Sequence, residues 1–279
     1  LTIFNHTLQK PSISFTWTVP DTVTTIGSSC LSYAFKDCVS LTSVDFKNVT
    51  TINDKGLFYA FQGCSNLTSA NLSKVTTIDD NGLFYAFNGC SKLTSVDLSN
   101  VTSIGGNGLS NAFKSCSRLT TMHLDKVTTI KDYGLDSAFY RSGVTSVDFN
   151  NVTTINAYGL NNAFDGCSNL TSVDLSNLTT VDSYGLNGAF KDCSNLTSVD
   201  LSNLAVVDSG GLVTAFRGCT SLTTMSFDKV SSIGPSGFQG AFNICSNLTT
   251  VSFPALTTSS FGTSTNQFDG MLVGCTGVS

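Results

Sequence analysis

Hydrophobic and polar residues alternate with two different periods inside a segment that recurs along most of the chain. The segment begins with Leu-x-x-Val-x-Leu, as in residues 170–175, and its last residues alternate as in a strand with one buried face. A second extended stretch follows, such as residues 101–104, and it is also rich in β-branched side chains. The pattern therefore predicts two short extended stretches in every segment.

The third part of the segment has the spacing of a short helix. Apolar residues recur at i, i+3, i+4 and i+7, as in Leu83, Ala86, Phe87 and Cys90. A Gly precedes this stripe, and a Gly or Asp lies near its end. We therefore expect a helix of about two turns at this place in each segment.

The dipeptide Ala-Phe marks the period of the repeat, and a fixed period of this length is typical of solenoids. The steps are 26 residues, except for one step of 25 between Phe139 and Phe164, and Phe268, preceded by Gln267 in place of Ala, continues the series. The units begin near Phe15, Leu41, Leu67, Leu93, Leu119, Val144, Leu170, Leu196, Leu222 and Leu248.

A single unit cannot enclose a core, but stacked units can, because each apolar position then forms a ladder along the stack. The sequence predicts an α/β solenoid of about ten 26-residue coils, with a parallel sheet on one face and short helices on another. At about 4.8 Å per coil the stack would be roughly 45–50 Å long. We expect a capping segment over residues 1–14, the solenoid over residues 15–270 and a C-terminal end over residues 271–279.

The two ends depart from the repeat. Ile13, Phe15, Trp17 and Val19 alternate with polar residues and predict a strand that covers the first coil. The alternative is that Trp17 is a surface residue that stacks on a ligand. At the other end Cys275 is out of phase with the repeat, which indicates a truncated or cleaved chain, and the missing initiator Met suggests a leader that was removed or lies outside this sequence.

The repeat carries a family resemblance. Leu-x-x-Val-x-Leu, then Leu/Val-Thr-Thr-Ile/Val, then Ala-Phe-x-x-Cys resembles the BspA-like leucine-rich repeats of the Treponema pallidum type, over residues 15–270. The unit is longer than the family's commoner repeat, with extra residues before Ala-Phe. The resemblance implies right-handed coils with a parallel sheet on one face. It also implies surface or secreted proteins of host-associated bacteria and some protists that act in adhesion and binding.

Composition and charge exclude several classes. Charged residues make up 12% of the chain, all nineteen acidic residues are Asp, and Ser and Thr together number 76. Coiled coils and helical bundles depend on Glu and Lys, so neither fits. No run of eighteen apolar residues is present, so we expect no membrane-spanning helix. The net charge of −5 argues against a nucleic acid as partner.

Most of the ten cysteines share one repeat position, which predicts buried thiols that fill space and not a disulfide framework. These are Cys38, Cys64, Cys90, Cys116, Cys167, Cys193, Cys219 and Cys245. Cys30 and Cys275 lie elsewhere in the repeat. Neither His6 nor His123 forms a recognisable pair with a nucleophile, and no Cys-x-x-Cys motif occurs. We therefore expect no catalytic residues, no metal and no cofactor.

The predicted sheet face offers one candidate binding surface. Its outward residues form a column of Asp45, Asn71, Asp97, His123, Asp148, Asp174, Asp200, Ser226 and Ser252. We single out Asp97, Asp148, Asp174 and Asp200. The last three belong to consecutive units, and adjacent carboxylates about 5 Å apart repel by somewhat under about 1 kcal/mol in water. A cation or a basic partner could relieve this repulsion. The alternative is a solvated polar face, since a flat column offers fewer oxygens than the 6–8 that Ca²⁺ prefers.

The second candidate surface carries tyrosines. Tyr33, Tyr59 and Tyr85 form one run, and Tyr133, Tyr158 and Tyr184 form another. Aligned exposed rings suit the recognition of carbohydrate or protein, so the second run is our candidate site. The alternative is that the rings only cover the predicted helix layer.

Together these features favour a monomeric, non-enzymatic recognition or adhesion module, located outside the cell or on its surface. Its partner would be a protein or a glycan, with no nucleic acid and no membrane insertion. The alternatives are a structural spacer or stalk that supports another domain, and a phage or secreted effector protein on the same scaffold.

Overall fold

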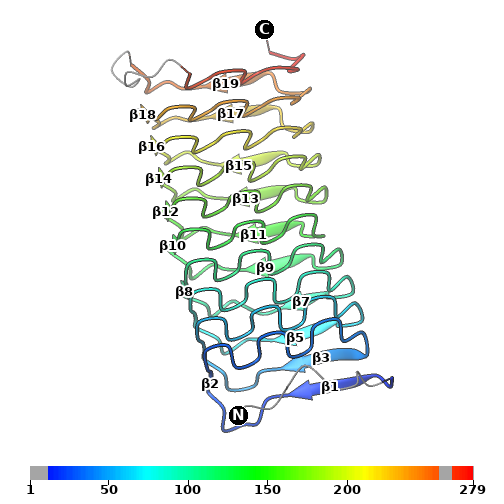
Figure 1. The fold of residues 1–279 in the computed structure, drawn as a ribbon. Coiled ribbons are helices and arrows are strands. Elements are labelled where there is room, and N and C mark those ends of the chain that lie inside the picture. Colours follow the sequence, from blue (N-terminus) through cyan, green and yellow to red (C-terminus); the bar gives the residue numbers. More distant parts are fainter. Residues whose placement is uncertain (1–11, 258–265, 279) are drawn as a thin grey trace.

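The computed structural model describes residues 12–257 and 266–278, which form a stack of similar coils with the two chain ends at opposite ends of the stack (Figure 1). The described residues contain nineteen short strands and no helix. The first row of strands consists of β1 (Phe15–Thr18), β3 (Leu41–Asp45), β5 (Ser69–Asn71), β7 (Ser95–Val96), β9 (Thr121–His123), β11 (Ser146–Asp148), β13 (Ser172–Asp174), β15 (Ser198–Asp200), β17 (Thr224–Ser226) and β19 (Thr250–Ser252). The second row consists of β2 (Thr25–Ile26), β4 (Thr51–Ile52), β6 (Thr77–Ile78), β8 (Ser103–Ile104), β10 (Thr129–Ile130), β12 (Thr154–Ile155), β14 (Thr180–Val181), β16 (Val206–Val207) and β18 (Ser232–Ile233).

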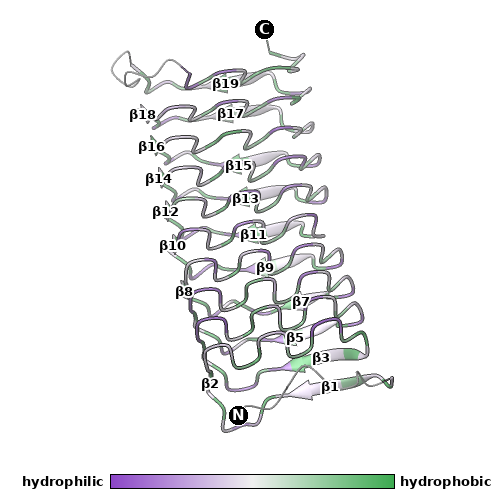
Figure 2. Ribbon diagram, viewed as in Figure 1, coloured by the Kyte–Doolittle hydropathy of each residue, from purple (hydrophilic) through white to green (hydrophobic). Residues whose placement is uncertain are grey.

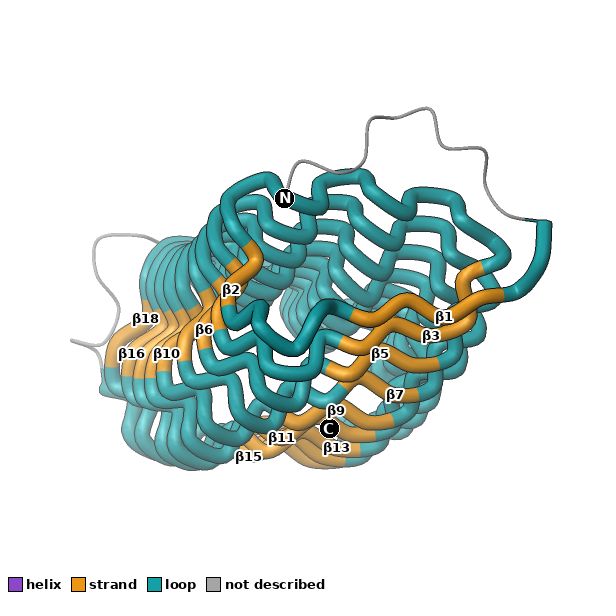
Figure 3. The backbone as a smooth tube through the Cα atoms, turned by 90° about the horizontal axis from the view of Figure 1, so that it is seen from below, coloured by secondary structure: helices purple, strands orange, loops and turns teal. Residues whose placement is uncertain are grey.

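Within each sheet the strands pair in parallel with their counterparts in the adjacent coil, and equivalent residues face one another. Val147 pairs with Val173 in the first row, and Ile130 pairs with Ile155 in the second. The first row divides into sheets of β1–β3–β5–β7, β9–β11–β13–β15 and β17–β19, and the second into β2–β4–β6–β8 and β10–β12–β14–β16–β18. Seen along the stack, successive coils have similar outlines and are offset progressively from one another (Figure 3). The chain is thus a β-solenoid of about nine complete coils with strands on two faces.

A ladder of turns occupies the third face, where the sequence predicts short helices, and that prediction is wrong. Backbone N–H groups in this face alternate between two kinds of acceptor. The Ala60 N–H donates to the carbonyl of Leu57 at 2.9 Å, which closes a turn, whereas the Phe61 N–H donates to the carbonyl of Ala86 in the next coil at 2.8 Å. A left-handed residue recurs every four positions, as at Tyr59 (φ +56°) and Gly63 (φ +73°). Turns such as 57–60 and 61–64 therefore have a positive φ at their third residue, as is typical of type II turns.

Size explains why turns replace helices here. An α-helix is about 10–12 Å across, whereas the strands fix the coils about 4.8 Å apart, so one helix per coil would require the stack to curve strongly, and turns do not. Turns leave half of their N–H groups free to bond to the next coil. A turn ladder with a period of four also buries positions i, i+3, i+4 and i+7, and Leu57, Ala60, Phe61 and Cys64 are all fully buried. The apolar spacing therefore does not distinguish the two structures.

The core is a set of side-chain ladders that run the length of the stack. The Phe residues of the Ala-Phe dipeptides, from Phe35 to Phe242, form one continuous column with ring centroids 5.2–5.7 Å apart. Coloured by hydropathy, hydrophobic and hydrophilic residues alternate along each coil (Figure 2). Each coil therefore contributes both to the core and to the surface.

The repeated cysteines are buried, as predicted, and their thiols bond to the core backbone. The Cys90 thiol donates to the carbonyl of Phe61 at 3.2 Å, and the Cys193 thiol donates to that of Phe164 at 3.0 Å. Burial raises the pKa of Cys116 to about 12. Thiols in this state are poor nucleophiles, because the thiolate is the reactive form.

Hydroxyl ladders account for much of the Ser and Thr content. Thr68 and Thr76 lead into the two strand rows, and their hydroxyls donate to the carbonyls of Thr42 and Thr50 one coil earlier, at 2.9 and 3.2 Å. The same bond recurs in most coils. It satisfies polar groups at the edges of the core, and this requirement favours Thr at the same repeat position throughout.

At the N-terminal end, Trp17 lies in β1 and packs against Phe35 and Phe46, with ring centroids 5.0 and 5.9 Å away. Ile13, which the predicted alternation places on the inner face, lies before β1 and is 79% exposed. Residues 1–11 of the predicted capping segment lie outside the described residues.

The C-terminal end corrects two further predictions. The Cys275 thiol donates to the carbonyl of Phe242 at 3.0 Å, the bond that defines the cysteine ladder, so Cys275 is in phase with the coils. Phe268 does not continue the Ala-Phe column. It stacks on Phe238, which is one turn earlier in the repeat, with centroids 5.7 Å apart. The last coil is four residues longer than the others, and this shifts the apparent sequence register.

Candidate functional site

The candidate aspartates of the first strand row are aligned but are engaged by their own chain. Asp148, Asp174 and Asp200 face one another in register on β11, β13 and β15. Each Oδ1 accepts a hydrogen bond from the backbone N–H two residues later, at 3.0, 2.9 and 2.9 Å. These bonds form Asx turns that end each strand. The column thus has a structural role that sequence reasoning missed, although the signal is present as Asp-x-Asn after β11 and Asp-x-Ser after β13 and β15.

Asp97 lies apart from the other three candidates, because His123 occupies the intervening coil. Its Oδ1 accepts bonds from the Ser99 hydroxyl at 2.7 Å and from the Ser99 N–H at 3.0 Å. These bonds, with a smaller contribution from His123 and Lys126, lower the pKa of Asp97. A shallow depression of about 660 Å³ covers this part of the sheet and includes Asp97 and His123 in its lining.

No group of three or more His, Cys, Asp or Glu side chains within residues 12–257 and 266–278 is arranged to hold a metal ion. The aligned aspartates form a polar column whose oxygens accept hydrogen bonds from their own turns.

The candidate tyrosines lie on the turn ladder and stack on one another. Ring centroids of Tyr133 and Tyr158 are 4.8 Å apart, and those of Tyr158 and Tyr184 are 5.1 Å apart, with nearly parallel planes. A Cβ atom added at Gly210 would lie 2.5 Å from the Tyr184 ring, so the last ring of the column rests on that glycine. The faces between neighbouring rings are therefore covered, and Tyr133, the first ring of the column, is the most exposed of the three.

The backbone at the tyrosines has an unfavourable conformation. Tyr133, Tyr158 and Tyr184 have φ values of +55°, +56° and +57°, in the left-handed region that suits Gly and Asn. Asn107 and Gly210 occupy the same repeat position in the coils on either side. A bulky ring at such a position costs conformational energy that Asn or Gly would avoid.

A polar ladder that sequence reasoning missed lies beside the tyrosines. The Asn161 amide donates to Asp136 Oδ1 at 2.8 Å, and the Asn187 amide donates to Asn161 Oδ1 at 2.7 Å. Burial raises the pKa of Asp136, although bonds from Asn161, Ser137 and Ser110 oppose the shift. The sequence signal is a polar residue at the repeat position that Phe58 and Phe84 fill in earlier coils.

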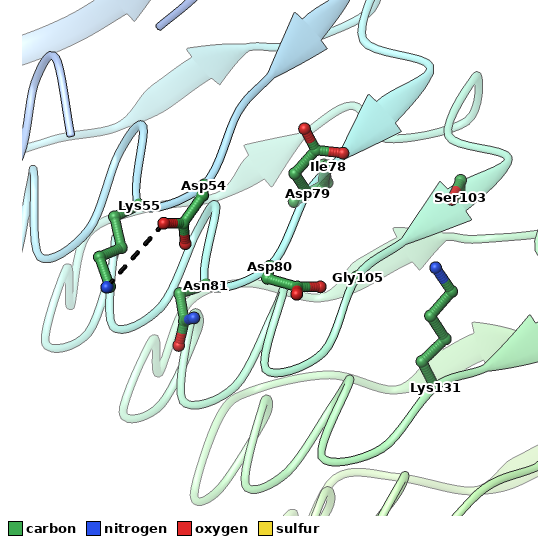
Figure 4. Close-up of a pocket in the computed structure, with 9 residues that line it drawn as sticks. All are labelled: Asp54, Lys55, Ile78, Asp79, Asp80, Asn81, Ser103, Gly105 and Lys131. Carbon is green, nitrogen blue, oxygen red and sulfur yellow. Dashed lines mark ion pairs between the residues drawn. The ribbon is translucent and has the colours of Figure 1, made fainter. Parts of the chain in front are cut away.

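A hollow of about 580 Å³ opens where the second strand row meets the turn ladder (Figure 4). Its lining consists of Asp54, Lys55, Ile78, Asp79, Asp80, Asn81, Ser103, Gly105 and Lys131. In Figure 4 the Lys131 side chain extends toward the coil of Gly105 from one side, and Asp80 lies on the other side. Sequence reasoning missed this hollow. Its signal is the Gly105-Gly106 pair at positions where the flanking coils carry Asp79-Asp80 and Lys131-Asp132.

In the described part of the chain, no helix has the length and apolar character needed to cross a membrane.

Comparison with known proteins identifies the repeat. A family model described as BspA type leucine rich repeat region (6 copies) matches residues 2–134, 32–162, 85–209 and 135–268. A search of curated proteins gives no match. The matches to the family model together extend from residue 2 to residue 268, which is nearly the whole chain.

Several solved structures are similar to this chain. A leucine rich cell surface protein from Faecalibacterium prausnitzii is 21% identical, with 95% of this chain and 77% of that chain covered and a TM-score of 0.42. The leucine rich repeat protein of T. pallidum is 20% identical, with 75% and 78% covered and a TM-score of 0.41. A leucine-rich repeat protein from Eubacterium ventriosum is 18% identical, with 95% and 78% covered and a TM-score of 0.40.

Proposed function

The chain belongs to the BspA-type leucine-rich repeat family, and from this premise we propose that it is a non-catalytic recognition module, outside the cell or on its surface, that binds a protein or a glycan. Members of repeat families of this kind present extended faces on which side chains recur at fixed spacing. In this chain the apolar side chains are stacked inside, so the outer positions are free to vary without loss of the core.

The observation that carries the proposal is the outer tyrosines. Six of the seven tyrosines have positive φ values between +54° and +58°. The interior is complete without them, since the Phe column is continuous from Phe35 to Phe242. Strained residues that do not serve the core are a reason to infer a role at the surface.

An array of extracellular matrix proteins, cell-surface glycoproteins and glycans, probed with the labelled chain, tests the proposal. We expect the chain to bind a restricted set of spots. A variant with Tyr133, Tyr158 and Tyr184 all replaced by Asn should lose this binding, because Asn tolerates the left-handed backbone while removing the rings.

A second variant locates the binding face. Replacing Asp148, Asp174 and Asp200 by Asn keeps the turn-forming acceptor, as Asn71 does in the third coil, where its Oδ1 accepts from the Ser73 N–H at 3.1 Å. If this variant alone loses binding, the strand face and not the tyrosine face is the site. A wild-type chain that binds no spot would instead favour the role of a spacer or stalk.

A further inference from the structure

The hollow at Gly105-Gly106 interrupts two side-chain columns that are otherwise filled. The equivalent positions one coil earlier carry Asp79 and Asp80, and one coil later they carry Lys131 and Asp132. The backbone closes over the gap on one side, because the Gly106 N–H donates to Asp80 Oδ1 at 2.7 Å. A Cβ atom at Gly105 would lie 2.5 Å from the Asp80 backbone nitrogen, so this position requires Gly.

Polar groups that line the hollow are not used by the fold. The side chains of Asp79, Asn81, Ser103 and Lys131 make no hydrogen bond or ion pair with any residue in the described ranges 12–257 and 266–278. The aspartates of the first strand row differ, since each caps a turn, as Asp174 does at 2.9 Å. The hollow therefore offers two oxygen acceptors of a carboxylate, an amide, a hydroxyl and an ammonium group to a ligand.

An aromatic ring lies at the margin of the hollow. Tyr133 follows Lys131 by two residues and is the first ring of its column, since Asn107 occupies the position before it. Tyr133 is 40% exposed, whereas Tyr158 and Tyr184 are half-buried. Tyr158 covers one face of the Tyr133 ring, and Tyr133 itself is not among the residues that line the hollow, so a bound sugar has to extend from the hollow to reach this ring.

We propose that this hollow binds the terminal sugar of a neutral glycan, with Tyr133 as the stacking platform and Asp79, Asn81 and Lys131 as partners of its hydroxyls. This inference rests on the proposed recognition function and selects the glycan among its two partner classes. A sugar ring has an apolar C–H face that packs on an aromatic ring, and it has adjacent hydroxyls that donate to the two oxygens of a carboxylate. The volume of about 580 Å³ lies within the range of small-molecule sites, about 300–1,000 Å³.

The charge of the lining favours a neutral sugar over an acidic one. Asp54, Asp79 and Asp80 outnumber Lys55 and Lys131, and the Lys55 ammonium already lies 3.9 Å from Asp54. The Asp54–Lys55 pair is close to neutral, so a carboxylated sugar would meet two further carboxylates, Asp79 and Asp80, and one further ammonium group, Lys131. Like charges at this separation repel, so an acidic terminal sugar is disfavoured.

Two variants test the site, and each has a matched control. Gly106→Leu adds a side chain at the margin of the hollow, beside Asp80, and its Cβ would make only ordinary contacts at 3.6 Å with Asp80 and Asp132. Gly27→Leu places the same side chain on the first coil, where nothing lies within 4 Å of the new Cβ. Tyr133→Asn removes the ring beside the hollow, and Tyr33→Asn removes the first ring of the other tyrosine run, which has the same left-handed backbone (φ +58°).

The ligands are short neutral oligosaccharides of glucose, galactose, mannose and N-acetylglucosamine, with a sialylated oligosaccharide as the acidic comparison. Saturation-transfer NMR detects binding, and calorimetric titration measures the affinity. We expect one neutral class to bind. Its affinity should fall roughly tenfold in Gly106→Leu and in Tyr133→Asn, and stay unchanged in Gly27→Leu and Tyr33→Asn.

Unchanged affinity in Gly106→Leu would overturn the inference and place sugar binding elsewhere, with the recognition function intact. Binding of the sialylated sugar alone, or of no sugar, would also overturn it. In that last case a protein bound on the array would still support the recognition function, whereas an empty array would remove both proposals. Equal melting temperatures of Gly106→Leu and Gly27→Leu exclude misfolding as the cause of lost binding.

Discussion

The inner phenylalanine column and the outer tyrosine column stack rings at almost the same spacing, yet they differ in every other respect. Phe139 is fully buried and lies 5.7 and 5.2 Å from the rings on either side, within an unbroken column. Tyr158 is half-buried, has a φ of +56° and belongs to a column of three rings that ends on Gly210. Ring stacking alone therefore does not make a column structural.

What separates the two columns is whether the fold needs them. Removing a buried ring leaves a cavity that the rigid stack cannot close. Removing an outer ring exposes little new surface and releases backbone strain. The inner positions are repeated because the core demands it, and the outer positions vary from coil to coil, which is where recognition can be encoded.

The largest expected effect comes from Phe139→Ala. The variant should lose about 3–5 kcal/mol of unfolding free energy, because it deletes a fully buried ring that stacks on two others. Urea denaturation followed by circular dichroism measures this loss. Phe139→Leu, which keeps most of the volume, should lose clearly less. A loss below about 1 kcal/mol for the Ala variant would mean that the column is not the structural core.

Gly143→Ala should have the next largest effect. Gly143 is in the coil that is one residue short, and a Cβ atom there would lie 2.2 Å from the Ser117 carbonyl oxygen. The backbone must shift to accommodate it, at a cost of about 1–3 kcal/mol. Gly27→Ala is the control, because its Cβ meets nothing within 4 Å and it therefore measures the effect of replacing Gly by Ala without a clash. Equal melting temperatures for the two variants would contradict the tight packing of the short coil.

Asp174→Ala should cost about 1 kcal/mol, because the Ser176 N–H loses its acceptor at 2.9 Å. Asp174→Asn should be close to neutral, since the amide oxygen keeps the Asx turn. Thermal unfolding of the pair measures the difference. If both variants lost the same stability, the carboxylate charge and not the turn would be the reason for the column.

Asp136→Asn should change the pH dependence of stability. Burial raises the pKa of Asp136 above its ordinary value of 3.8, so between these two pKa values the folded protein binds more protons than the unfolded chain. The Asp136 contribution therefore makes the wild type more stable as the pH falls through this window. In the Asn variant that part of the dependence should be absent. Urea midpoints of the two proteins across mildly acidic pH test this, and parallel curves would contradict it.

Much of the fold follows from the sequence, because a stacked repeat multiplies each local preference. The coil period, the Phe column and the buried cysteines are predictable from the recurrence of apolar residues. The turn ladder on the third face is not predictable from the apolar spacing, because a ladder with a period of four buries the same positions as a helix. The C-terminal register is also lost, since Phe268 resembles the Ala-Phe position while four added residues place it elsewhere.

The candidate sites are less predictable, for a different reason. Sequence identifies which residues share a column, and Asp148, Asp174 and Asp200 do share one. It does not reveal that their oxygens are already bonded to the next turn, or that the stacked tyrosines cover one another's faces. The hollow lies at Gly105, where the neighbouring coils carry Asp79 and Lys131, and a missing side chain is recognisable only by comparison with the neighbouring coils.

The smallest expected effect gives the most direct test of the claim that the outer tyrosines do not hold the fold. The measurement is the unfolding free energy, from urea denaturation, of the variant with Tyr133, Tyr158 and Tyr184 all replaced by Asn. Two stacking contacts are lost and three left-handed backbone positions are relieved, and these terms of about 1 kcal/mol each largely offset one another. The account predicts a stability within about 1 kcal/mol of the wild type. A loss comparable to that of Phe139→Ala would contradict it, because the tyrosines would then be required for the stability of the fold.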